Sequence, residues 1–202
     1  MKNYKAWILD FDGTLYFQKP VQIFMALWLI AHYIFRPTRL KEIFVLRDWR
    51  RLREQRFCAD KENFRELQLA ELSRRYDLPK DVIEKVLRRW LIERPLKILR
   101  HFVRKKLLAA VKHQQNLGVK IIVYSDNPVT EKLAAINFSP DASFFADDDL
   151  ILCMKPDVHG LKKILSLQKL KPAEVLYIGD RDDRDGICAR LAGVDYLDVK
   201  NF

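Results

Sequence analysis

The sequence of 202 residues predicts an α/β protein, in which a parallel sheet is interrupted by a helical insertion. Short apolar runs near both ends of the chain stop at polar residues, as buried parallel strands do. Residues 17–95 show no strand pattern, and their apolar residues recur at intervals of three and four. We therefore expect residues 1–16 and 96–202 to form an α/β core, and residues 17–95 to form an all-helical cap subdomain.

The strands of the core are expected where β-branched and aliphatic residues cluster. Four runs fit this pattern, with the last as an edge strand: 5–9, 119–124, 175–178 and 194–197. A shorter apolar piece covers residues 144–146. Because right-handed crossovers make such strands parallel, the polar residues that follow them should meet in one crevice.

Helices are expected between these strands and throughout the insertion. Pro79 and Pro95 punctuate two helices of the insertion, and the long segment 96–117 ends at Gly118, a helix C-cap signal. Further helices are expected after Pro128, over residues 157–167 and around residues 186–191.

Composition and charge narrow the class of protein. Hydrophobic residues make up 49% of the chain and charged residues 32%, so a disordered chain is excluded. The net charge of +10 favours anionic partners, namely phosphorylated substrates, lipid headgroups or nucleic acid. The N-terminus lacks a signal-peptide pattern, and the three widely spaced cysteines suggest neither a disulfide framework nor a zinc site. These features predict a cytoplasmic protein.

The most informative string is DFDGTL, from Asp10 to Leu15. Two carboxylates separated by one residue at a strand end, followed by Gly-Thr, place two acids and several backbone N–H groups around one small volume. An isolated pair of this kind could be a simple turn. The complete string after an apolar strand is far more specific.

DFDGTL resembles the first motif of the haloacid dehalogenase (HAD) superfamily of phosphatases, and three further resemblances follow in the family's order. Ser125 in IIVYSDN resembles the second motif, Lys155 in MKPD the third, and Asp180 to Asp185 in YIGDRDDRD the acidic fourth. The resemblance covers residues 1–16 and about 96–198. It implies a Rossmann-like core with a helical cap inserted after the first motif.

The resemblance also implies roles for single residues. Asp10 would be the nucleophile that becomes an aspartyl-phosphate, and Asp12 the acid and base that serves the leaving oxygen and then water. Thr14, Ser125 and Lys155 would bind the phosphoryl oxygens. The dehalogenase branch of the family lacks an acid at the position of Asp12, so its presence counts against dehalogenation.

A magnesium ion is expected as cofactor, because a carboxylate attacks an anionic phosphate only when the phosphoryl charge is neutralised. By the same resemblance, the metal ligands would be Asp10, Asp180 and the backbone carbonyl of Asp12, with Asp185 acting directly or through water. Asp182 and Asp183 are expected to be solvated loop acids or helix N-caps.

The resulting prediction is a magnesium-dependent phosphomonoester hydrolase with a small phosphorylated metabolite or a phosphorylated lipid headgroup as substrate. Two alternatives stay open at this point. One is a phosphoryl-transfer mutase of the same fold, and the other is a non-catalytic binding protein for anionic lipid or nucleic acid.

Residues 21–56 are the least explained segment. An apolar run over residues 21–35 precedes many arginines, and it is too short for a membrane-spanning helix. The simplest expectation is a buried cap helix followed by solvated arginines. The alternative is peripheral contact of residues 21–56 with an anionic membrane surface. Nucleic acid is not expected, because no binding motif for it is present, and the acidic run 147–149 is expected to be a solvated loop without a role.

Overall fold

The structure is a computed structural model that describes residues 3–55 and 64–202. Its centre is a sheet of five parallel strands, which confirms the predicted fold class. The strands are β1 (Ala6–Leu9), β2 (Lys120–Ser125), β3 (Ala142–Phe145), β4 (Val175–Gly179) and β5 (Asp195–Asp198). All four predicted runs and the short apolar piece therefore correspond to strands, within one or two residues.

The order of the strands, β3-β2-β1-β4-β5, places β1 at the centre of the sheet. Leu9 at the end of β1 is in register with Val123 of β2 and with Ile178 of β4. The carboxyl ends of the three central strands are thus level with one another. The residues that follow these strands lie at the crevice where α/β sheets bind their ligands.

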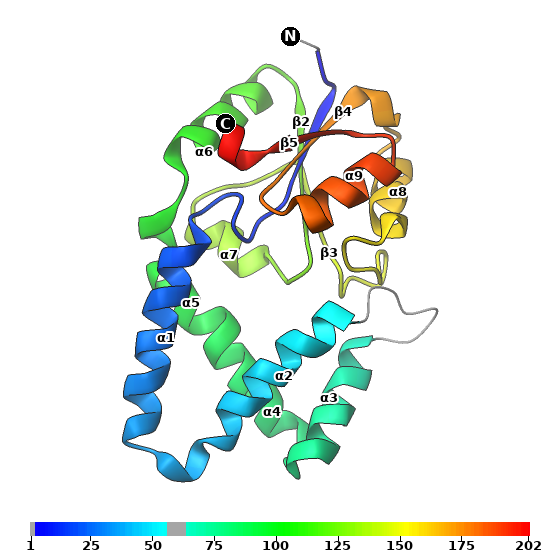
Figure 1. Cartoon of the computed structure of the whole chain (residues 1–202). Helices are drawn as coiled ribbons and strands as arrows, with labels where there is room; N and C mark the ends of the chain where they lie inside the picture. Colours follow the sequence, from blue (N-terminus) through cyan, green and yellow to red (C-terminus); the bar gives the residue numbers. More distant parts are fainter. Residues whose placement is uncertain (1–2, 56–63) are drawn as a thin grey trace.

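Four helices cover the two faces of the sheet (Figure 1). They are α6 (Lys105–Asn116), α7 (Thr130–Ala135), α8 (Val158–Leu167) and α9 (Ile187–Leu191). Val111 of α6 and Leu133 of α7 belong to one buried apolar cluster, whereas Leu161 of α8 and Ala189 of α9 belong to another. Coverage on both faces explains why the strands read as continuous apolar runs.

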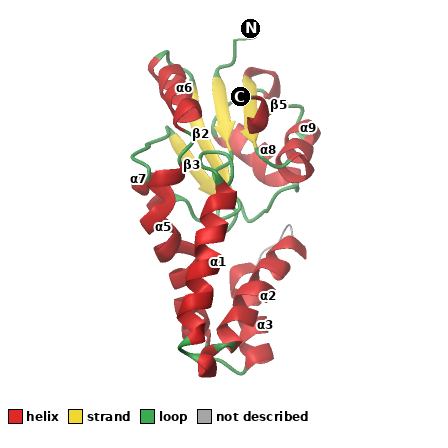
Figure 2. Cartoon of the chain, turned by 60° about the vertical axis from the view of Figure 1, so that its left-hand side comes forward, coloured by secondary structure: helices red, strands yellow, loops and turns green. Residues whose placement is uncertain are grey.

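Within residues 17–55 and 64–99, five helices form the insertion between β1 and β2. They are α1 (Gln18–Ile34), α2 (Lys41–Gln55), α3 (Phe64–Tyr76), α4 (Lys80–Arg88) and α5 (Arg94–Leu99). Tyr33, Trp49, Leu72 and Trp90 belong to a separate apolar core within this insertion. Figures 1 and 2 show it at the carboxyl edge of the sheet, with α1 along one side and α2 and α3 along the other.

The segment 96–117 is not one helix, contrary to expectation. After α5, a 3₁₀ turn over Arg100–Phe102 leads to Val103, whose extended backbone pairs with Tyr16 in an antiparallel bridge. The N–H of Phe17 donates to the carbonyl of Phe102 at 2.9 Å, and that of Arg104 donates to Leu15 at 2.9 Å. The chain entering the insertion is therefore hydrogen-bonded to the chain leaving it. The cap limits of 17 and 95 stay predictions.

Pro95 also does not end a helix. It lies in the first turn of α5, where proline is tolerated, and a π-helical turn over Arg89–Glu93 joins α4 to α5 without a break. The apolar run over 21–35 is helical, but along α1 only Val21 and Tyr33 are buried. The expectation of a buried helix there was wrong. Among the described residues, no helix combines the length and the apolar character needed to cross a bilayer.

The cysteines differ from the sequence-based expectation as well. Cys188 is a free buried thiol, whereas Cys153 is disulfide-bonded. Cys58 and Arg56 lie outside the described residues. Spacing along the chain does not reveal which cysteines form disulfides, and the cytoplasmic location stays a prediction.

Candidate active site

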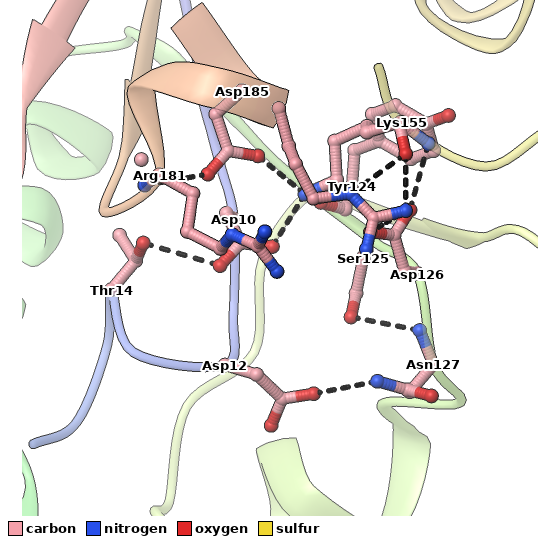
Figure 3. A network of polar contacts seen from close by, with 12 residues as sticks. Asp10, Asp12, Thr14, Tyr124, Ser125, Asp126, Asn127, Lys155, Arg181 and Asp185 are labelled. Carbon is pink, nitrogen blue, oxygen red and sulfur yellow. Dashed lines mark hydrogen bonds and ion pairs between the residues drawn. The ribbon is translucent and has the colours of Figure 1, made fainter. Parts of the chain in front are cut away.

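A cavity of about 780 Å³ lies at the carboxyl edge of the sheet. Its core side is lined by residues from all four motifs, and its cap side by Trp49, Arg53 and Trp90 among others. Figure 3 shows the carboxylates of Asp10 and Asp185 converging on Lys155, with Asp12 facing Asn127. The fold thus brings all the predicted site residues to one cavity wall or next to it.

The turn after β1 positions Asp10 and requires a glycine. Gly13 has φ +98°, and a Cβ at this position would lie 2.1 Å from Oδ2 of Asp180. This close approach brings the backbone after β1 against the acid that follows β4. Thr14, which comes next, donates its hydroxyl to Oδ2 of Asp10 at 3.2 Å. Thr14 is fully buried and holds the Asp10 carboxylate rather than facing open solvent.

Lys155 is the charged centre of the site. Its Nζ lies 2.6 Å from Oδ1 of Asp10 and 2.6 Å from Oδ1 of Asp185, and the side chain is 2% exposed. Burial lowers the pKa of Lys155, but the two carboxylates outweigh burial and hold its pKa well above the ordinary value. Lys155 is therefore positively charged and fixes the orientation of both acids.

Asp10, Asp180 and Asp185 form a cluster whose nearest carboxylate oxygens all lie within 4.8 Å of one another. Burial raises the pKa of Asp10, with Lys155 opposing and the neighbouring acids reinforcing the rise. Burial and the nearby Asp185 raise the pKa of Asp180 to about 6. These directions show that one lysine does not balance three acids. Hard oxygen donors short of positive charge fit Mg²⁺, and Asp10, Asp180 and Asp185 would hold it.

The other two acids of the fourth motif lie outside this cluster. Asp182 pairs with Arg190 at 2.7 Å and Asp183 pairs with Arg181 at 2.7 Å, and both acids are exposed. Asp185 instead points inward, where its Oδ2 accepts the N–H of Arg181 at 3.2 Å. A π-helical turn over Asp182–Gly186 produces this difference between neighbouring acids.

Asp12 lies in a different environment from Asp10. Nζ of Lys132 lies 2.7 Å from both of its oxygens, Asn127 donates to Oδ2 at 3.2 Å, and the hydroxyl of Tyr16 donates to Oδ1 at 2.8 Å. Burial alone would raise the pKa of Asp12, but Lys132 and the two other donors bring it below the ordinary value. Asp12 is therefore an ionised carboxylate that lines the same cavity as Asp10.

The second and third motifs are tied together through the backbone. Ser125 ends β2, is 1% exposed, and accepts the N–H of Asn127 at 3.1 Å. Asp126 accepts the N–H of Lys155 at 2.9 Å, and Arg184 donates through Nε to the carbonyl of Lys155 at 2.8 Å. These contacts fix the loop that delivers Lys155 to the acids.

A sequence model of the haloacid dehalogenase-like hydrolases matches residues 4–193 of this chain. The chain belongs to this family of hydrolases. The resemblance seen in the four motifs is thereby confirmed over nearly the whole length, including the helical insertion.

Several solved structures share this HAD-like fold at low sequence identity. The HAD-hydrolase YfnB from Bacillus subtilis, bound to magnesium, has a TM-score of 0.63 at 14% identity, covering 96% of this chain and 88% of that one. A 2-haloacid dehalogenase from Pseudomonas syringae has a TM-score of 0.62 at 16% identity, covering 96% and 85%. A phosphoglycolate phosphatase from Haemophilus somnus, named so by prediction, has 0.57 at 16%, covering 97% and 85%.

These likenesses establish the fold. Because dehalogenases and phosphatases both appear among them, they do not choose between the two reactions. No curated protein sequence matches the chain.

The HAD-like site contains residues that the sequence analysis missed. Lys132 lies in α7 with no motif around it, and the chain has 37 Lys and Arg from which to choose. Asn127 was part of the string around the second motif but received no role. Only the fold, which places the start of α7 over the turn after β1, shows that both contact Asp12.

Asp147 corrects another expectation. Its side chain is 6% exposed and pairs at 3.0 Å with Arg53, which is itself 7% exposed and comes from α2 of the insertion. Arg53 also donates to the backbone carbonyl of Asp126 in the core. Asp147 is therefore not a solvated loop acid but part of a buried ion pair between insertion and core.

Proposed function

We propose that this HAD-like hydrolase is a phosphatase that cleaves phosphomonoesters through an aspartyl-phosphate on Asp10. The observation that carries the proposal is the second acid: Asp12 lies in the same cavity as Asp10 and is held by Lys132, Asn127 and Tyr16. Phosphoryl transfer needs a group that moves a proton to the leaving oxygen and from water, and a carboxylate in this place supplies it.

In the first half of the reaction, an oxygen of Asp10 attacks phosphorus while the bond from phosphorus to the leaving oxygen breaks. The substrate enters as its monoanion, and Asp12 passes the proton of the phosphate group to the leaving oxygen. Lys155 holds the Asp10 carboxylate in one orientation through its 2.6 Å contact. Such fixed geometry removes much of the entropic barrier to in-line attack.

In the second half, water attacks the phosphorus of the aspartyl-phosphate and gives its proton to Asp12. The bond from phosphorus to Asp10 then breaks, which releases phosphate and restores both acids. The lowered pKa of Asp12 keeps this carboxylate ready to accept the proton. When bound, Mg²⁺ neutralises the charge of the phosphoryl oxygens so that an anionic nucleophile can approach.

The cavity supports a phosphorylated substrate with a second anionic or amphiphilic part. Besides the site residues, it is lined by Arg50, Arg65 and Arg88 of the insertion, together with apolar side chains such as Met25 and Leu91. On this side of the cavity the basic side chains outnumber the acids Asp81 and Glu84, and together with the apolar side chains they suit a phosphorylated metabolite or a phosphorylated lipid headgroup.

Phosphate release from p-nitrophenyl phosphate with Mg²⁺ tests the reaction, and halide release from a 2-haloacid tests the dehalogenase alternative on the same sample. We expect phosphate release only, with a loss of at least about 10³-fold in Asp10→Asn. Asp183→Asn is the matched control, because this acid is exposed and outside the cluster. Full activity of Asp10→Asn, or halide release by the wild type, would contradict the proposal.

Asp12→Asn separates the two half-reactions. p-Nitrophenolate leaves as a stable anion, so the first step should survive while attack of water on the intermediate loses its base. We expect a burst of about one p-nitrophenolate per enzyme followed by a rate reduced about 10² to 10⁴-fold. A mutase would instead return the phosphoryl group to an acceptor, and phosphate release in every turnover of the wild type would exclude that as the main activity.

A further inference from the structure

The outer face of α1 carries an apolar stripe that nothing in the described chain covers. Ile23, Leu27, Ile30 and Ile34 recur at three and four residues, and they are 60%, 61%, 60% and 68% exposed. Phe24, beside this stripe, is 52% exposed. The opposite face of α1 packs inward through Val21 and Tyr33. Figure 2 shows α1 at the front and outside of the insertion, which leaves its outer face open.

The surroundings of this stripe are basic throughout. Residues 17–41 contain four Lys and Arg, residues 94–112 contain seven, and neither segment contains an Asp or Glu. The two segments lie side by side, because α1 packs against α5 and the following turn, with the rings of Phe24 and Phe102 5.6 Å apart. Exposed Lys97, whose Nζ lies 5.8 Å from the ring centroid of Trp28, and exposed Arg100, two residues before Phe102, therefore lie close to α1.

We propose that the outer face of α1 is a docking surface for an anionic membrane. The helix is about 25 Å long, which suits lying in the plane of the interface. Ile23, Leu27, Ile30 and Ile34 would enter the boundary between headgroups and acyl chains, and the lysines and arginines beside them would contact the lipid phosphates.

This surface is narrower than the segment 21–56 that the sequence suggested. Trp49 is 3% exposed and Arg53 faces Asp147 of the core, so these two residues of the segment are not available to a membrane surface. Lys97 and Arg100, which the sequence did not suggest, replace those residues at the border.

The charge of the face argues for a membrane over a second copy of the chain. Two copies meeting through α1 in a symmetric dimer would bring two acid-free basic borders together, and like charges at an interface repel. An anionic bilayer accepts the apolar stripe and the basic border at once.

Flotation with lipid vesicles tests the proposal. We expect the wild-type protein to float with vesicles of phosphatidylcholine and 30% phosphatidylserine at about 0.1 M salt, and not with phosphatidylcholine alone. Leu27→Glu/Ile30→Glu should lower the bound fraction at least about tenfold, since it removes apolar area and adds like charge to the lipid. Lys97→Gln/Arg100→Gln should weaken binding by about fivefold per charge.

Leu191→Glu is the matched control, because Leu191 is 61% exposed but lies on α9 of the core. It should float like the wild type. Asp10→Asn should also float, which distinguishes binding through α1 from capture of a headgroup in the active site. Leu27→Glu/Ile30→Glu should keep phosphate release from a soluble ester, so failure of this proposal is separate from failure of the proposed activity.

The proposal is overturned if the wild type does not float with anionic vesicles, or if Leu27→Glu/Ile30→Glu floats equally well. Light scattering after size exclusion addresses the other occupants. A dimer that Leu27→Glu/Ile30→Glu converts to a monomer, without vesicle binding by the wild type, would assign this face to a second copy of the chain.

Discussion

The acid cluster of the core and a buried acid of the insertion, Asp48, differ in how their negative charge is balanced. In the core, Asp10, Asp180 and Asp185 share Lys155, and the pKa values of Asp10 and Asp180 rise above their ordinary range. In the insertion, Asp48 is 3% exposed and is held by Arg47, Arg75 and Tyr76. Hydrogen bonds from Arg47 and Tyr76 hold the pKa of Asp48 well below its ordinary value.

This difference in charge balance indicates different roles for the two regions. A buried cluster with more acids than bases destabilises the folded state when no cation is bound. The same excess of negative charge favours binding of a cation. Asp48, which is surrounded by donors and lies outside the cavity lining, contributes to the stability of the insertion. The core therefore holds the cluster that is short of positive charge, and the insertion supplies walls, contacts and surfaces around it.

The largest effect is expected from replacing Lys155, the lysine that Asp10 and Asp185 share. Lys155→Met leaves Asp10 and Asp185 buried without a positive partner, so we expect a loss of at least about 10³-fold in kcat and about 3 kcal/mol in the free energy of unfolding. Activity assays and denaturant unfolding measure the two effects. Lys163→Met, on the exposed side of α8, should change stability by less than about 0.5 kcal/mol. Equal behaviour of the two variants would refute the central role of Lys155.

The next largest effect is expected from breaking the ion pair that joins the insertion to the core. Arg53→Gln breaks the buried ion pair with Asp147, and we expect KM to rise about tenfold with kcat nearly unchanged, because the wall of the cavity loses its anchor. Steady-state kinetics measure it, and Asp147→Asn should give the same effect without further loss in the double variant. Lys80→Gln breaks the exposed pair with Glu66, which lies outside the cavity lining, and should change KM less than about twofold.

The acid cluster makes magnesium binding dependent on pH. Because the pKa of Asp180 is raised to about 6, this carboxyl holds a proton below pH 6 and loses it as pH rises. Metal binding requires the deprotonated form, so the rise in Tm caused by Mg²⁺ should be at least twice as large at pH 7.5 as at pH 5.5. Thermal unfolding with and without Mg²⁺ measures it. An equal shift at both pH values, or a shift that persists in Asp180→Asn, would argue against this cluster as the metal site.

The smallest expected effect is the loss of stability when Asp48 of the insertion is replaced. Asp48 has a lowered pKa in the folded state, so its stabilisation is present above the unfolded pKa near 4 and is lost as pH falls further. Asp48→Asn should cost about 1 to 2 kcal/mol at pH 7 and clearly less at pH 3. Denaturant unfolding at the two pH values gives the difference. A cost that does not shrink at low pH would mean that the side chain acts by packing rather than by charge.

Three of the four motifs were readable in the sequence because each lies at a strand end, and strand ends in a parallel sheet meet at one edge. Asp10, Ser125 and Asp180 could therefore be predicted as neighbours, whereas Lys155 lies in a loop and was placed with them only by its resemblance to the third motif. Lys132, Arg53 and Asp147 could not be predicted, since each lies in a helix or loop whose position depends on packing between distant segments.

What the sequence alone determined is the strand pattern, the helical insertion and the chemical types at the strand ends, because these depend on local periodicity and on residue identity. Tertiary structure decided which face of α1 is covered, which acids face inward and which arginines reach the core. Those outcomes depend on the relative placement of whole helices. When a helix such as α1 is apolar on both faces, hydrophobic periodicity does not show which face packs against the rest of the protein.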